Sequence, residues 1–259
     1  MRVSLFVTCL VDQFFPEVGK SVVQILEELG VEVEFPEAQT CCGQPAFNDG
    51  FRREARMLAE RFLSLFEQSE YIVAPSGSCT SMVRNFYPEL FAAEPHLKAK
   101  AQAIAARTFE FSQFLVRVLQ VEDVGAVYRR AEPDPLHTGP VKVAYHDSCH
   151  LLRELGVYEE PRRLLQHVQG IELVPLEKAD MCCGFGGLFS LKYSAISDAI
   201  LQEKVEHILA SGAEILVAND TGCLMQIGGK LHRQRCPVQV MHLAELLARR
   251  DGDRGERRP

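Results

Sequence analysis

The sequence has 259 residues, with 47% hydrophobic and 24% charged side chains and a formal net charge of −7. This balance excludes a disordered or fibrous chain, and the length suffices for one large domain or two of ordinary size. Lys and Arg form no stripe, which argues against nucleic-acid binding, and the apolar runs are too short to predict a membrane-spanning helix.

The first segment, MRVSLFVTCLVDQFF (1–15), begins with a short apolar run that Asp12 interrupts. No small-residue cleavage site follows the run, so the segment does not fit a secretory signal peptide. We therefore predict a β-strand over 3–9 and a cytoplasmic protein.

The rest of the first half alternates helical and extended patterns. Apolar residues at helical spacing predict a helix over 21–29, with Gly30 as its cap. VEVEF (31–35) alternates and YIVA (71–74) is apolar, so both are predicted to be strands. A second helix is predicted between them from the spacing of Ala55, Leu58, Phe62, Leu65 and Phe66.

The segment VEDVGAVYRRAEPDPLHTGP (121–140) is rich in Pro and Gly and lacks periodicity, which is typical of an interdomain linker. The second half then repeats the order of the first. IELVPL (171–176) and EILVA (214–218) are predicted strands, with a helix near 194–210 between them. Residues 251–259 end a basic segment that also carries Asp and Glu, and are expected to be a flexible, solvated tail.

This alternation of strands and helices predicts an α/β fold with parallel sheets. Each half is predicted to contain, in order, a strand, a helix, a strand, a cysteine-containing turn, a helix, a strand and a helix. We expect two homologous lobes, each a small parallel sheet with flanking helices, related by a pseudo-two-fold repeat. The predicted domains are residues 1–120 and 141–250, joined by the linker.

The nine cysteines are the most informative residues of the chain. Eight of them form two sets with matching spacing, and the sequence around them repeats too, as VSLFVTC (3–9) and VKVAYHDSC (141–149) show. Cys236 has no counterpart and is interpreted as a small buried residue or a surface thiol. The first set is Cys9, Cys41, Cys42 and Cys79, and the second is Cys149, Cys182, Cys183 and Cys223.

In each set the cysteines follow the ends of predicted strands. Because the carboxyl ends of parallel strands meet at one edge of a sheet, each set is expected to form one site. Buried, unpaired thiolates repel one another, and a bound metal removes this cost. Four thiolates match the ligand count of a [4Fe–4S] cluster. The adjacent cysteine pairs need sharp turns, which Gly43 and Gly184 would supply.

Other interpretations of these residues stay open. The thiols would alternatively bind zinc, form disulfides or remain free, although the CxxC form usual for zinc is absent from the chain. GFGG (184–187) lacks the spacing of a dinucleotide-binding loop, and no NAD, flavin, Walker or nucleophile-elbow motif is present, so no catalytic residue is assigned. Asp220 is interpreted as a residue that fixes a turn.

The motif HDSCH (146–150) places two histidines beside one cysteine of the second set. They would bind the metal, donate to a cluster sulfur or move protons, or merely cap the following helix. The first half has Phe6 and Leu10 at the same places, so the two sites need not be equivalent. The residues predicted to surround the metal centres are Gly43, Gly184, His146 and His150.

Six segments that together span nearly the whole chain carry a family resemblance: FVTCLVDQFFPEVGKSVVQILEELG, CCGQPAFNDG, APSGSCTSMVR, HDSCHLLRELG, CCGFGGLFS and CLMQIGG. They resemble the cysteine-rich CCG domain of the heterodisulfide reductase catalytic subunit and of the iron–sulfur subunits of glycolate oxidase and anaerobic glycerol-3-phosphate dehydrogenase. The resemblance is closer still to the lactate utilization protein A family, whose members carry two such domains. This resemblance implies an iron–sulfur oxidoreductase subunit that acts with two partner proteins in oxidising L-lactate to pyruvate.

The resemblance also implies one iron–sulfur cluster per lobe, held by the two cysteine sets. In the heterodisulfide reductase relatives each motif holds a non-cubane [4Fe–4S] cluster and carries a further cysteine, where this chain has Met82 and Gln226. A conventional cubane, a modified cluster or zinc in one lobe therefore stay open. Two alternative functions are a thiol–disulfide reductase subunit and a zinc-stabilised scaffold that assembles partners.

Overall fold

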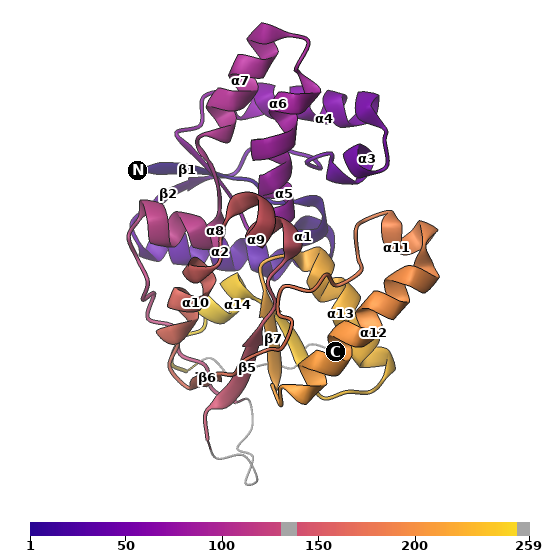
Figure 1. Cartoon of the computed structure of the whole chain (residues 1–259). Helices are drawn as coiled ribbons and strands as arrows, with labels where there is room; N and C mark the ends of the chain where they lie inside the picture. The colour runs from indigo at the N-terminus through magenta and orange to yellow at the C-terminus, as the bar shows by residue number, and fades with distance from the viewer. Residues whose placement is uncertain (131–138, 253–259) are drawn as a thin grey trace.

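The computed structural model describes residues 1–130 and 139–252, and it has two lobes that each contain one four-stranded parallel sheet (Figure 1). The strand orders are β2-β1-β3-β4 and β6-β5-β7-β8, so the two sheets share one topology. The first sheet consists of β1 (Arg2–Leu5), β2 (Glu32–Glu34), β3 (Tyr71–Ala74) and β4 (Thr108–Glu110). The second consists of β5 (Val141–Tyr145), β6 (Ile171–Leu173), β7 (Ile215–Ala218) and β8 (Gln239–His242).

Helices cover both faces of each sheet, which is the arrangement that buries a parallel sheet. The first lobe contains α1 (Cys9–Phe14), α2 (Pro16–Glu28), α3 (Gln44–Asn48), α4 (Arg52–Leu65), α5 (Gly77–Ser81), α6 (Tyr87–Leu90), α7 (Pro95–Ala105) and α8 (Phe111–Gln113), with π-helical segments η1 (Met82–Phe86) and η2 (Phe114–Val118). The second contains α9 (Cys149–Leu155), α10 (Glu159–Gln166), α11 (Phe189–Lys192), α12 (Ser194–Ala210), α13 (Thr221–Arg233) and α14 (Leu243–Leu247). Across the described ranges, no helix is both long and apolar enough to cross a bilayer.

The predicted α/β fold with one parallel sheet per lobe is confirmed. Strand β3 and helix α12 have the predicted bounds, and the N-terminal segment forms β1, although that strand ends at Leu5. The helix predicted over 21–29 begins earlier, at Pro16, because the first turn of a helix does not need the N–H that proline lacks.

Each lobe also has a fourth strand, which the sequence analysis did not predict. Strands β4 and β8 have three and four residues and continue directly into helices α8 and α14, so no turn signal separates them from the helical pattern. They are defined by their pairing, in which Val73 lies opposite Phe109 and Val217 opposite Met241. The sequence therefore predicted three strands in each lobe, one fewer than the four that the structure has.

One hydrophobic core is shared by the two lobes. It combines residues of β1 and α2 with residues of β5 and α14, and it includes Ala126 and Tyr128 of the predicted linker. A second cluster lies on the other face of each sheet. The domain bounds stay a prediction, and 131–138 of the linker and 253–259 of the tail lie outside the described residues.

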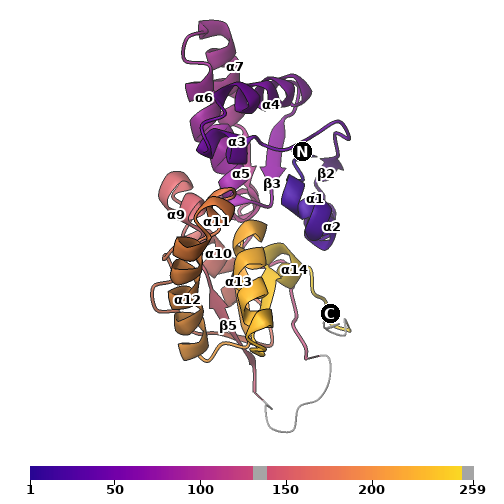
Figure 2. The ribbon, with the colours of Figure 1, turned by 90° about the vertical axis from the view of Figure 1, so that its right-hand side faces the viewer.

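The carboxyl ends of the two sheets face each other across the lobe interface. Helix α5 follows β3 on the side of the first lobe that faces the second (Figure 2), where it packs against α9, and α1 packs against α13. The approach is close, since a Cβ at Gly77 would lie 2.5 Å from the Cβ of Leu151. The sites predicted at the strand ends therefore lie along the contact between the lobes.

Two polar contacts join the fourth strands to the opposite lobe. Glu110 caps α8 and accepts a hydrogen bond of 2.9 Å from Nδ2 of Asn219. Its counterpart His242 caps α14, and its Nε2 lies 3.1 Å from the carbonyl oxygen of Pro75. The same positions of the repeat thus tie each lobe to the other through different side chains.

Candidate metal centres

The first cysteine set gathers at the carboxyl edge of the first sheet. Cys9 opens α1, Cys41 and Cys42 lie in the turn before α3, and Cys79 lies in α5. The Sγ atoms of Cys9 and Cys41 are 3.7 Å apart, and those of Cys42 and Cys79 are 3.3 Å apart. Cys42 and Cys79 are buried, whereas Cys9 and Cys41 are half-buried. The four cysteines thus lie together at one edge of the sheet, as the sequence predicted.

A glycine turn brings the two adjacent thiols to one site. Gly43 has a φ of +85°, in the left-handed region, and its N–H donates to Sγ of Cys41 over 3.4 Å. The hydroxyl of Tyr87 holds the turn from inside by donating to the carbonyl oxygen of Cys42 over 2.9 Å. A backbone N–H donor, such as that of Gly43, stabilises negative charge on sulfur.

The second cysteine set repeats this arrangement. Cys149 opens α9, Cys182 and Cys183 lie in the turn before α11, and Cys223 lies in α13. The Sγ atoms of Cys183 and Cys223 are 3.1 Å apart. Gly184 has a φ of +83°, and its N–H donates to Sγ of Cys182 over 3.3 Å. The turn is tighter here, since a Cβ at 184 would lie 2.6 Å from a backbone oxygen of α12.

The sulfur atoms of each set share protons unequally. Hydrogen bonds from Cys42 and Cys9 lower the pKa of Cys41 to about 3. In the same way, hydrogen bonds from Cys149 and Cys183 lower the pKa of Cys182 to about 2. In the second set a hydrogen bond from Cys183 also lowers the pKa of Cys223, to about 6. One thiolate is therefore favoured in the first lobe and two in the second, and the neighbouring thiols act as donors.

Other thiols of these sets hold their protons more tightly. The pKa values of Cys42 and Cys183 are raised because both thiols donate to the neighbouring thiolate and both are buried. A bound cation or cluster would replace the shared protons and neutralise four thiolates at once. The donor set thus fits a thiolate-binding metal or an iron–sulfur cluster.

The sequence matches a known domain and a known family. Residues 3–84 and 143–228 match the model of the cysteine-rich CCG domain. Lactate utilization protein A of Bacillus velezensis is 51% identical over 247 residues, which cover 95% of this chain and 99% of that protein. The same protein of Geobacillus kaustophilus is 50% identical over 97% of this chain and 100% of its own length. The chain belongs to the lactate utilization protein A family. The resemblance inferred from the motifs is confirmed.

The fold also matches a solved structure. A hypothetical protein from Helicobacter pylori superposes with a TM-score of 0.58 and 11% sequence identity, over 99% of this chain. This chain spans about half of that protein, since the match covers 49% of its length. At this identity the likeness concerns the fold alone.

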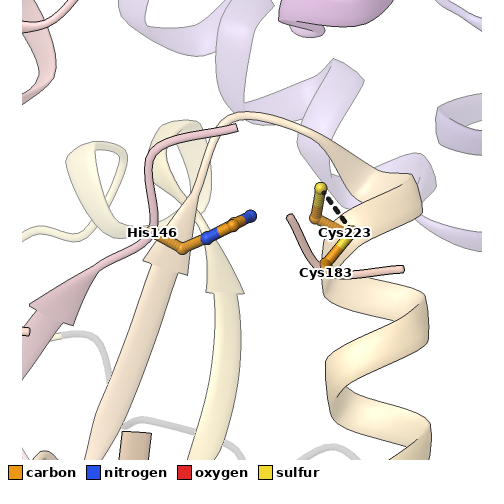
Figure 3. A group of neighbouring side chains, drawn as sticks. All are labelled: His146, Cys183 and Cys223. Carbon is orange, nitrogen blue, oxygen red and sulfur yellow. Dashed lines mark hydrogen bonds between the residues drawn. The ribbon is translucent and has the colours of Figure 1, made fainter. Parts of the chain in front are cut away.

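In this member of the family, the residues that surround the two cysteine sets differ. His146, at the end of β5, is fully buried, and its ring extends toward Cys183 and Cys223 (Figure 3). Its nearest ring nitrogen and the two sulfur atoms all lie within 4.8 Å of one another. The first lobe has Phe6 at this place, and within the described residues the grouped histidine and cysteines are those of the second set.

A buried lysine near the second set was not predicted from the sequence. Lys204 on α12 is fully buried, and its Nζ donates to the carbonyl oxygens of Lys178 (2.8 Å) and Ala179 (2.9 Å). Burial lowers its pKa to about 8. Aligning the two helices of the repeat places Phe62 opposite Lys204, and a lysine at an apolar helical position was the signal available in the sequence.

The two positions that hold a further cysteine in heterodisulfide reductase relatives have other roles here. Met82 is buried in the core of the first lobe. Gln226 donates to Oγ of Ser197 over 2.9 Å, and that hydroxyl donates to the carbonyl oxygen of Gly184 over 2.8 Å. Gln226 therefore supports the cysteine turn of the second lobe from behind.

His150 and Cys236 contact residues other than the cysteines of the two sets. The Nδ1 atom of His150 is 2.8 Å from Oε2 of Glu154, which also accepts a hydrogen bond from Ser81 of the first lobe. Cys236 is half-buried, and its Sγ lies 3.9 Å from atoms of Gln234. Cys236 thus fits the interpretation of a thiol outside the sites.

Asp220 fixes a turn, but in the opposite lobe. It stands at the N-cap of α13 without capping that helix. Its Oδ1 accepts hydrogen bonds from Oγ of Ser76 (2.9 Å) and Oγ of Ser78 (2.6 Å), and the carboxylate also accepts from the Ser78 N–H (3.2 Å). Ser76 in turn caps α5 through the N–H of Cys79. The second lobe thus supports the helix that carries a cysteine of the first.

Proposed function

We propose that the chain is an iron–sulfur oxidoreductase subunit that takes part in the oxidation of L-lactate to pyruvate. The observation that carries this proposal is the gathering of eight thiols into two sets at the facing edges of two sheets. The name of its relatives, lactate utilization protein A, supports lactate as the substrate of the system. The expected location is the cytoplasm.

Each set would bind one cluster through its four sulfur atoms. In the first lobe the ligands would be Cys9, Cys41, Cys42 and Cys79, and in the second Cys149, Cys182, Cys183 and Cys223. The count of four thiolates matches a [4Fe–4S] cluster, and the N–H groups of Gly43 and Gly184 would donate to the ligand sulfurs. Such clusters, when bound, accept and release single electrons.

Two such centres fit the stoichiometry of the reaction. Oxidation of lactate to pyruvate releases two electrons and two protons, so one electron would pass to each centre. Two partner proteins would complete the system by binding lactate and by accepting the electrons.

Metal analysis tests this proposal directly. Protein purified without oxygen is expected to contain about eight iron and eight sulfide per chain, as two [4Fe–4S] clusters require. The Cys236→Ser variant is the matched control and is expected to keep the full content. Zinc without iron in both lobes would support the scaffold alternative and overturn this one.

Growth on L-lactate tests the role of the chain in the cell. A deletion strain without a redundant enzyme is expected to lose growth on L-lactate, and Cys236→Ser is expected to restore it while Cys42→Ser is not. Restoration by Cys42→Ser would contradict the role of the cysteine set. Turnover of a disulfide substrate by a reduced electron carrier would instead support the thiol–disulfide reductase alternative.

A further inference from the structure

The imidazole of His146 has one nitrogen that no hydrogen bond accounts for. The ring is fully buried, and its Nδ1 lies 3.2 Å from the carbonyl oxygen of Ala179. A carbonyl oxygen only accepts hydrogen bonds, so Nδ1 carries a proton, and in the neutral imidazole Nε2 then carries the lone pair. Within the described part of the chain Nε2 has no hydrogen-bond partner.

This free lone pair lies beside the second cysteine set. The nitrogen and the Sγ atoms of Cys183 and Cys223 lie within 4.8 Å of one another, and the ring extends toward both residues (Figure 3). A buried acceptor without a donor costs free energy, unless something absent from the chain itself binds there. A histidine whose Nδ1–H is held by a backbone carbonyl is the usual state of a metal-ligating imidazole.

The orientation of the ring is fixed by a further buried group. Ala179 O accepts not only from His146 but also from Nζ of Lys204 (2.9 Å) and from the N–H of Asp147 (3.1 Å). Lys204 also holds the preceding carbonyl oxygen, that of Lys178. Lys204 thus holds in place the segment whose carbonyl oxygen, that of Ala179, contacts Nδ1 of His146. With Nδ1 held there, Nε2 faces the sulfur atoms.

The first lobe has neither of these groups. Phe6 and Phe62 stand where the second lobe has His146 and Lys204, and their rings pack edge to face with centroids 4.9 Å apart. The imidazole and the buried amine therefore replace a pair of aromatic rings. A nitrogen ligand is available to one centre and not to the other.

We infer that Nε2 of His146 is a ligand of the metal centre in the second lobe, and that Lys204 positions it. This inference rests on the proposed binding of metal by the cysteine sets. The second centre then has five ligands, four thiolates and one imidazole, which is one more than a cubane [4Fe–4S] cluster takes, whereas the four thiolates of the first lobe match a cubane.

Nitrogen hyperfine spectroscopy tests the ligand assignment. Reduced, oxygen-protected protein labelled with ¹⁵N-histidine is expected to show a strongly coupled nitrogen by electron–nuclear double resonance. The coupling is expected to disappear in His146→Phe, which introduces the residue of the first lobe, and to persist in His150→Gln. It is also expected to persist in Cys42→Ser, which removes the centre of the first lobe.

The positioning role of Lys204 has its own readout. Lys204→Met is expected to keep the metal and to change the nitrogen coupling, whereas an unchanged coupling would overturn this part of the inference. In Lys204→Met and His146→Phe, the signal of the first-lobe centre reports whether the protein has folded.

The outcomes separate this inference from the proposed function. Two clusters without a nitrogen coupling, or with one that survives in His146→Phe, overturn the inference and leave the function standing. Zinc in the second lobe with a nitrogen neighbour by X-ray absorption, lost in His146→Phe, supports the ligand and overturns a cluster in that lobe. Absence of metal from both lobes overturns both.

Discussion

The two lobes have the same sulfur geometry in different surroundings. The inner pair of sulfur atoms is 3.3 Å apart in the first lobe and 3.1 Å apart in the second, and the turn glycines have φ values of +85° and +83°. Behind the sulfur atoms, the first lobe has the packed rings of Phe6 and Phe62. The second lobe has the imidazole of His146, the amine of Lys204 and the hydroxyl of Ser197. The comparison teaches that the turn and the strand ends set where the sulfurs lie, while side chains packed behind them set the chemical environment.

The largest expected effect tests whether the two sets act separately. Cys42→Ser and Cys183→Ser each remove one sulfur from a different lobe, and each is expected to lose roughly half of the iron and sulfide because four ligands bind one cluster. Metal analysis with sulfide determination measures this loss. A single variant that lost all metal would show that the centres are interdependent.

The turn glycines provide a sharper comparison of the lobes. Alanine at 184 would meet a backbone oxygen at 2.6 Å, whereas alanine at 43 would meet one at 3.3 Å. Both carry the cost of a positive φ, about 1–3 kcal/mol, and the closer contact adds to it. Thermal unfolding is expected to rank Gly184→Ala as more destabilising than Gly43→Ala.

Gly30→Ala is the matched control for these two variants. Gly30 has a φ of +75° and no atom within 4 Å of a built Cβ, so its substitution measures the backbone cost without a clash. If all three variants lost the same stability, the close contact at 184 would have no energetic role.

Asp220 tests how strongly one lobe supports the other. Asp220→Ala leaves the Ser76 and Ser78 donors without their acceptor at a buried interface. The expected loss is about 1–3 kcal/mol in the free energy of unfolding, measured by urea denaturation. Asp220→Asn keeps one oxygen acceptor and is expected to lose less, and equal losses would contradict a hydrogen-bonding role.

The smallest expected effect compares the two interface caps. Burial raises the pKa of Glu110 to about 7 and lowers the pKa of His242 to about 4. Between pH 4.5 and 7 the folded state keeps a proton on Glu110 that the unfolded state has lost, so this contribution to stability falls as pH rises. Between pH 4 and 6.5 the unfolded state protonates the histidine and the folded state does not, so this contribution rises with pH.

Single substitutions of these caps are expected to change the pH dependence in opposite directions. Relative to wild type, the unfolding free energy of Glu110→Gln should rise with pH, and that of His242→Gln should fall, by at most about 1.4 kcal/mol per pH unit. Urea unfolding at several pH values measures both slopes. Parallel curves for the two variants and wild type would show that neither cap titrates with a shifted pKa.

Part of the fold was readable from local pattern. The apolar run YIVA and the long helix α12 have the predicted bounds because their patterns extend over a full strand and several helical turns. The fourth strands were missed because they continue directly into helices α8 and α14, and only their pairing with neighbouring strands defines them. The candidate site was likewise only partly predictable. His146 and His150 both flank Cys149 in the sequence, and only the structure shows that His146 faces Cys183 and Cys223 while His150 contacts Glu154.

The sequence by itself determined that the chain repeats, that each repeat carries four cysteines at strand ends, and that a glycine follows each adjacent pair. These features depend on spacing along the chain and on local backbone geometry. The tertiary structure alone decided that a lysine lies buried behind the second set, that Asp220 supports the opposite lobe, and which histidine faces the sulfurs. Such contacts join residues far apart in sequence, so their partners are fixed only when each lobe folds and, for Asp220, only when the two lobes pack together.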